Sequence, residues 1–132
     1  MDNPLLDTSG LPRFADFDPA HPAPPTWDGF VLPLEDLSDR LRRAWGLVGH
    51  LNAVVNSPQL REAYNANLPR ITEYYTELGQ NEALFAKYRA LAEGPGRSAL
   101  TPARRPVVDN EVRDFRLSGA ELPPERKQRY RE

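Results

Sequence analysis

Residues 57–79 read SPQLREAYNANLPRITEYYTELG, and this stretch decides the fold class. Its apolar side chains recur at steps of four, four, three, four and three residues: Leu60, Tyr64, Leu68, Ile71, Tyr75 and Leu78. This spacing is close to the 3.5-residue period with which two helices pack along a seam. Ser57 and Pro58 suit the N-cap and the first helical position, because the hydroxyl can accept from a free amide and proline has no amide to leave unpaired. The stretch therefore predicts a helix with one buried face. At Pro69 it predicts either a bend or a cost of about 3 kcal/mol that the packing absorbs.

A second helix is predicted to precede this one, beginning at Pro33. Its apolar residues share one face at 100° per residue: Leu34, Leu37, Leu41, Ala44, Trp45, Val48, Leu51 and Val55. Another face carries the small residues Gly46, Gly49 and Ala53, which would let a second backbone approach closely. An equally weighted interpretation is that the glycines only loosen an exposed face. The two helices together predict a helix hairpin.

Two more helical segments are predicted downstream. The first carries Leu84, Phe85, Tyr88, Leu91 and Ala92 and stops at Gly94-Pro95-Gly96; the second carries Val108, Val112 and Phe115 and ends at Ser118-Gly119. Pro106 is expected to start the second one, which leaves residues 101–105 as a turn. No alternation typical of strands occurs, so the predicted fold class is all-α, built from helix hairpins.

Proline marks the N-terminal part of the chain, where six of the 14 prolines precede the first long helical pattern. Because proline fixes φ and lacks an amide donor, residues 1–32 are predicted to form an extended, proline-rich arm. Its apolar residues are too many for a free tail, so we expect the arm to pack on something. Residues 33–132 are predicted to form a helical domain that is truncated at its C-terminus, because the charged segment from Glu125 onward has no stop signal.

Composition excludes several classes of protein. The 132 residues carry a net charge of −2, contain no cysteine and lack both a secretory signal and an apolar run long enough to span a membrane, which favours one domain in the cytoplasm. Residues 97–132 hold nine basic and six acidic side chains, but these charges alternate, as on a solvated helix face. We therefore expect neither nucleic-acid nor membrane binding.

Residues that could carry chemistry are scarce. His21 and His50 are the two histidines, and neither has the spacing or the partners of a metal site, so we expect no metal ligand and no cofactor in this chain. Glu73 and Glu77 are one helical turn apart, but no nucleophile or base accompanies them, so no catalytic residue is expected. Tyr74 and Tyr88 point off the apolar seam. With Gly46, Gly49 and Ala53 they form the predicted domain-packing face.

Longer strings of the sequence carry a family resemblance. NPLLDTSGLPRF at residues 3–14, HLNAVVNSPQLREAYN at 50–65, TELGQNEALF at 76–85 and DFRLSGAELPPERK at 114–127 resemble the N-terminal portion of the thimet oligopeptidase family of zinc metallopeptidases. The resemblance implies a helical enzyme whose N-terminal helices form one wall of a deep channel that admits short peptides. It places zinc and an HExxH motif in a later portion of the enzyme. That motif is absent here, so this chain is expected to be inactive alone.

One departure from the family pattern lies near residues 17–22. Family members continue there into a long amphipathic helix before the PTW string, whereas here Pro22 to Pro25 follow directly. The loss of that helix would remove a packing partner from the first predicted helix.

Two hypotheses about function follow. The first is an N-terminal channel-wall domain of a zinc metalloendopeptidase (an oligopeptidase), with the missing C-terminal catalytic portion and short peptides as its partners. The alternative is a freestanding helical interaction module that binds a peptide or a partner helix along Gly46, Gly49 and Ala53. In either case exposed helical faces are expected to favour self-association.

Overall fold

The structure, a computed structural model, describes residues 24–131, and this part of the chain contains helices and no strand. The elements in order are η3 (Trp27–Val31), α1 (Leu32–Val54), α2 (Pro58–Gly79), α3 (Glu82–Glu93), η4 (Pro95–Ala99), α4 (Arg104–Leu117) and α5 (Pro124–Arg131). The prediction of an all-α fold is confirmed. Residues 1–23, which make up most of the predicted arm, lie outside the described residues.

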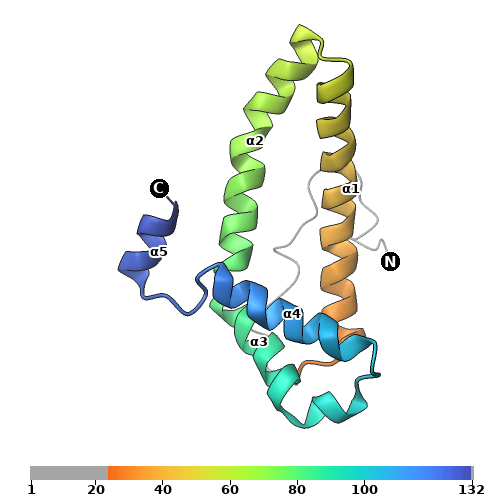
Figure 1. Cartoon of the computed structure of the whole chain (residues 1–132), viewed down its shortest axis with the longest axis vertical. Coiled ribbons are helices and arrows are strands. Elements are labelled where there is room, and N and C mark those ends of the chain that lie inside the picture. The colour runs from red at the N-terminus through yellow and green to blue at the C-terminus, as the bar shows by residue number, and fades with distance from the viewer. Residues whose placement is uncertain (1–23, 132) are drawn as a thin grey trace, which may run out of the picture.

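The two longest helices, α1 and α2, form the predicted hairpin (Figure 1). The connection turns at Asn56, whose φ of 49° is left-handed. Ser57 then caps α2, because its hydroxyl accepts the amide of Leu60 at 3.2 Å, and Pro58 takes the first position. Figure 1 shows the two helices joined at this tip and farther apart at their other ends. The hairpin therefore opens toward the rest of the molecule.

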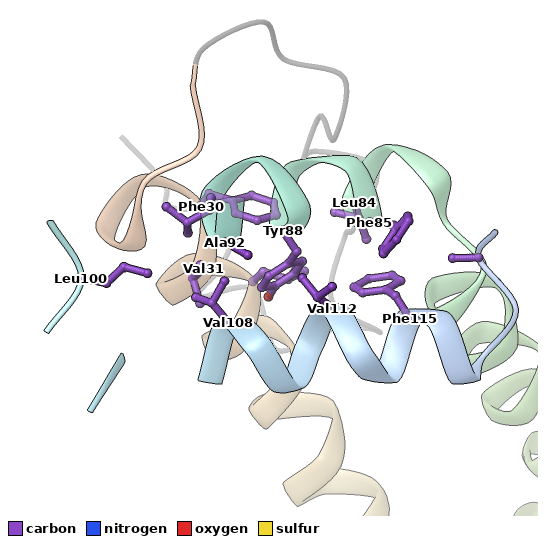
Figure 2. Close-up of a cluster of buried hydrophobic side chains, with 13 residues drawn as sticks. Phe30, Val31, Leu84, Phe85, Tyr88, Ala92, Leu100, Val108, Val112 and Phe115 are labelled. Atoms are coloured by element: carbon purple, nitrogen blue, oxygen red, sulfur yellow. The ribbon is translucent and has the colours of Figure 1, made fainter. Parts of the chain in front are cut away.

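The hydrophobic core lies at the open end of the hairpin, where α3 packs on α4. Figure 2 shows this cluster: Phe30 and Val31 come from η3, Leu84 to Ala92 from α3, and Val108, Val112 and Phe115 from α4. Its aromatic rings meet at offset or edge geometry, with Tyr88 centred 4.9 Å from Phe30 and 5.6 Å from Phe115. The base of the hairpin is held to this core through Leu34 of α1 and the partly buried Leu78 of α2.

The end of the predicted arm is helical rather than extended. Thr26 caps η3 by accepting the amide of Gly29 at 3.1 Å, and α1 begins at Leu32, one residue before Pro33. Phe30 and Val31 are 3% and 0% exposed, so burial in the α3–α4 core stabilises a helical turn that the nearby prolines did not indicate. Residues 27–32 are therefore helical where the sequence predicts an extended arm.

The predicted seam of α2 is only partly buried. Ile71 is 7% exposed, whereas Leu68 and Tyr75 are 38% and 41% exposed. The predicted apolar face of α1 divides in the same way: Leu34, Leu37 and Leu41 are buried, but Leu51 and Val55 are exposed. Periodicity identified the apolar faces correctly. Periodicity could not show that α1 and α2 are too far apart to cover the whole apolar face of each helix.

Prolines lie within α2 and α4 without interrupting either helix. The helix α2 runs unbroken from Pro58 to Gly79 with Pro69 inside it. The helix α4 starts at Arg104, so Pro106 is in the first turn, where its missing donor costs no helical bond. The predicted turn is therefore shorter, and Thr101 accepts the amide of Arg104 at 3.3 Å.

Candidate functional site

The predicted packing face begins with the small residues of α1. Gly49 lies against the hairpin partner, because a Cβ added there would be 3.9 Å from Cε2 of Tyr64. A Cβ added at Gly46 would meet nothing within 4 Å, and Ala53 is exposed. The structure therefore separates the three residues: Gly49 serves the contact with α2, while Gly46 and Ala53 remain open.

A stacked aromatic pair holds the hairpin near its tip. The rings of Trp45 and Tyr64 are 4.8 Å apart between centroids, with an interplanar angle of 9°. Farther along α2, Tyr74 packs edge-on against Tyr75 at 5.2 Å, and partial burial raises the pKa of its hydroxyl, with a smaller contribution from Tyr75. Tyr74, one of the two tyrosines assigned to the predicted domain-packing face, is therefore half-buried within the hairpin.

Tyr88 does not belong to any packing face. Only 1% of it is exposed, and its ring lies in the core between Phe30 and Phe115. The assignment of Tyr88 to a domain surface was wrong because α3 is covered on two sides, by η3 and by α4. A tyrosine that points off one apolar seam can still face a second element.

Sequence reasoning missed a titratable group at the junction of α1, α3 and α4. Burial raises the pKa of the Glu111 carboxyl to about 7, with smaller contributions from Glu35 and Asp114. Burial also raises the pKa of the Tyr88 hydroxyl, with smaller contributions from the charges of Glu111 and Glu35. The spacing could have indicated this, because Glu111 lies three residues after Val108 and four before Phe115, at the edge of the core face. A carboxyl that titrates near neutral pH can serve as a general acid, but no nucleophile or bound water-activating group accompanies Glu111 among the described residues.

The described residues offer no site for a metal ion. They contain no group of three or more histidine, cysteine, aspartate or glutamate side chains that could hold one. His50 lies exposed on α1. No helix in residues 24–131 is long and apolar enough to cross a membrane.

One surface hollow lies along the flank of α2, with a volume of about 510 Å³. It is lined by Leu68, Pro69, Thr72, Glu73, Thr76 and Glu77. The hydroxyls of Thr72 and Thr76 donate to carbonyls of their own helix at 3.0 and 2.9 Å. Glu73 and Glu77 thus border an open hollow with no catalytic partner among the described side chains. This geometry favours their interpretation as a polar helix face.

Comparison with known proteins places this arrangement in a family. Residues 20–127 match the family described as Neurolysin/Thimet oligopeptidase, N-terminal domain. The chain is similar to oligopeptidase A of Haemophilus influenzae, with 40% identity over 153 aligned positions, and to oligopeptidase A of Escherichia coli, with 41% over 154. A probable cytosolic oligopeptidase A of Arabidopsis thaliana is 29% identical over 149 positions, covering 97% of this chain and 21% of that protein.

The two bacterial alignments cover 100% of this chain but 22% and 23% of the relatives. The chain therefore spans less than a quarter of the length of the curated relatives that it matches. Together with the all-helical fold, the match over 20–127 shows that the chain belongs to the neurolysin/thimet oligopeptidase family and corresponds to its N-terminal domain.

Proposed function

We propose that this chain is the N-terminal channel wall of an oligopeptidase that degrades short peptides. The observation that carries the proposal is the match of 20–127 to the N-terminal domain of the family, in a chain that covers about a fifth of relatives named oligopeptidase A. In this proposal the helices limit which peptides can enter. The hydrolytic groups belong to the rest of the enzyme.

Zinc enters the proposal only through that remaining portion. The donor groups of the described residues do not fit the ion, because they include no cluster of three potential ligands. No step of hydrolysis is therefore assigned to this chain. Its own contribution is steric: the long helices α1 and α2, held at their bases by the α3–α4 core, provide a surface that excludes folded proteins.

The proposed partners are the catalytic portion of the family enzyme and the short peptides that it would cleave. Gly46 and Ala53, open on α1, are the proposed points where another backbone packs closely. The proposed location is the cytoplasm. This is supported by the absence of cysteine and by the Arabidopsis relative described as probably cytosolic.

A fusion experiment tests the proposal. The chain would be joined to the portion of the Escherichia coli relative that follows its matched region, and turnover would be measured on peptides of increasing length and on a folded protein. We expect the fusion to cleave the short peptides, and we expect turnover to fall sharply as the peptides become longer. A second fusion with Gly46→Trp should keep its fold, since that position is open, but lose activity, because the bulky side chain would block the proposed packing of the catalytic portion there.

Two results would contradict the proposal. One is a fusion that is folded and zinc-loaded yet inactive on every peptide, because this chain would then not complete the enzyme. The other is a fusion that cleaves a folded protein as readily as short peptides, because these helices would then not restrict access.

A further inference from the structure

Two carboxylates lie at the junction of α1, α3 and α4. Glu35 is in the first turn of α1, four residues after the buried Val31, and Glu111 is on α4, three residues after the buried Val108. Val31 and Val108 belong to one core cluster, so both glutamates extend from its edge. Each side chain is only partly exposed, and the charge of Glu35 contributes to the raised pKa of Glu111. We call Glu35 and Glu111 the carboxylate pair.

No cation among the described residues neutralises the carboxylate pair. Neither glutamate forms an ion pair there, whereas the nearby Asp114 contacts Arg113 at 3.0 Å. Arg42, whose charge reaches Glu35 from seven residues away, is held by Asp39 at 2.6 Å. The positions three and four residues from each glutamate carry no lysine or arginine: Val31, Leu32, Ser38 and Asp39 on α1, and Val107, Val108, Asp114 and Phe115 on α4.

A buried hydroxyl at the same junction also lacks a partner. Tyr88 of α3 is 1% exposed, and its hydroxyl forms no hydrogen bond with a described group. Figure 2 shows its ring extending from α3 toward α4, with the oxygen at the α4 end, between Val108 and Val112. Burial raises the pKa of this hydroxyl, and the charge of Glu111 raises it further. An ionised Glu111 is therefore the acceptor that the junction offers to Tyr88.

The carboxylate pair is costly in the chain alone. Burial disfavours an ionised carboxyl, and a second carboxylate nearby adds repulsion. The chain alone therefore keeps Glu111 protonated up to a pKa of about 7. A cation between the two glutamates would remove both penalties and let Glu111 ionise. Arginine suits this place, because its planar guanidinium has five donors and can bind two carboxylates at once.

The arginine has a source in the rest of the enzyme. The chain covers 22% and 23% of its two bacterial relatives, and the proposed function places a catalytic portion against Gly46 and Ala53 of α1. At 100° per residue, Glu35 lies about 20° from Gly46 around the helix and in line with Ala53. The carboxylate pair therefore adjoins the face on which that portion is proposed to pack.

We propose that Glu35 and Glu111 together bind one arginine side chain of the catalytic portion and so dock the N-terminal domain on it. This inference rests on the proposed function and adds a specific polar contact between the two portions. In the docked state Glu111 is ionised and accepts the hydroxyl of Tyr88. The polar groups that have no partner in the free chain are then all paired.

Hydrogen exchange of α4 peptides, measured by mass spectrometry at pH 8, tests the inference in two contexts. One is the free 132-residue chain, and the other is its fusion to the catalytic portion of the Escherichia coli relative. In the free chain Glu111→Gln should slow exchange several-fold, because glutamine is neutral without taking up a proton. In the fusion the same substitution should speed exchange several-fold, because glutamine cannot pair with the arginine. Glu35→Gln should also speed exchange in the fusion.

A control variant separates this contact from a general effect of charge. Glu62 is exposed on α2, near the hairpin tip and away from the carboxylate pair. Glu62→Gln should therefore leave the exchange of α4 unchanged in both contexts. Unchanged circular dichroism of the free variants would establish that they fold.

Two outcomes would overturn the inference. One is slower exchange of Glu111→Gln in both contexts, because no cation would then arrive with the catalytic portion. The other is faster exchange already in the free chain, because the cation would then come from within the 132 residues. Peptide cleavage is a separate readout: an active fusion without the reversal contradicts only the docking contact. An inactive fusion with the reversal supports the contact and contradicts the proposed function.

Discussion

At the scale of single residues, Glu111 is expected to make stability depend on pH. Its pKa is raised to about 7 in the folded chain, mainly by burial, whereas an unfolded glutamate titrates near pH 4.3. The protonated form therefore stabilises the fold fully below about pH 4.3, and this contribution is lost as the pH rises through 7. Because the carboxyl is only half-buried, solvent reduces the effect to about 1 to 2 kcal/mol.

Glu111→Gln should consequently unfold at the same denaturant concentration as the parent chain near pH 4.5 and be more stable by about 1 to 2 kcal/mol at pH 8. Urea unfolding across this range measures the difference. Glu77→Gln, at an exposed position of α2, is the control. An equal effect of Glu111→Gln at both pH values would mean that the carboxyl is not protonated in the fold.

Tyr88 gives a second prediction at this scale. Its ring is 1% exposed, and its buried hydroxyl has no hydrogen-bond partner among the described groups. Tyr88→Phe removes an unpaired polar atom and keeps the ring, so it should leave stability unchanged or raise it by up to about 1 kcal/mol. Tyr88→Ala should cost about 3 to 5 kcal/mol through loss of packing. A large loss in Tyr88→Phe would reveal a hydrogen bond that holds the hydroxyl.

Sequence reasoning failed at these two residues for one physical reason. Periodicity shows which residues share a face of a helix, but not how many elements cover that helix. Tyr88 shares the apolar face of its own segment with Leu84 and Leu91, and η3 and α4 both enclose that face. The spacing places Glu111 at the edge of the core face of its helix, but it does not show that the junction of three helices buries the carboxyl.

At the scale of elements, α2 yields a prediction about the cost of its internal proline. Pro69 removes an amide from the middle of the helix, and α2 is continuous around it. Pro69→Ala should stabilise the chain by about 1 to 3 kcal/mol, because it restores the helical bond and removes the ring's clash with the preceding turn. Thermal melting measures this. A loss of stability would show that the proline ring makes packing contacts worth more than the missing bond.

Leu68→Ala is the companion prediction on the same helix. A fully buried leucine would cost about 2 to 5 kcal/mol on truncation, but Leu68 is 38% exposed, so we expect about 1 kcal/mol or less. Ile71→Ala, at a position only 7% exposed, should cost clearly more. Equal losses for the two variants would mean that the hairpin is closed in solution.

The hairpin itself could be predicted because its local signals agree. Ser57 caps α2, Pro58 starts it, and the seam repeats at helical spacing. The separation of α1 and α2 could not be predicted, because it depends on how far apart the α3–α4 core holds their bases. Propensity likewise favoured an extended chain near Trp27, and burial of Phe30 and Val31 in that core overrode it.

At the scale of the whole molecule, the described residues combine one packed core with a long hairpin whose outer half carries exposed apolar side chains. The sequence predicts no metal site and no catalytic residue in this chain, since two histidines and no cysteine offer little to a metal or a nucleophile. The partners of the domain could not be read from the same residues, because they depend on surfaces that form only after folding.

The central claim is that this domain shapes access to a catalytic site and contains none itself. The most direct measurement is mass-spectrometric detection of products when the purified 132-residue chain is incubated with a library of short peptides, with and without added zinc. We expect no product above buffer, because the described residues contain no cluster of side chains that could hold a water-activating metal ion. Turnover that follows the chain through purification and scales with its concentration would contradict the claim.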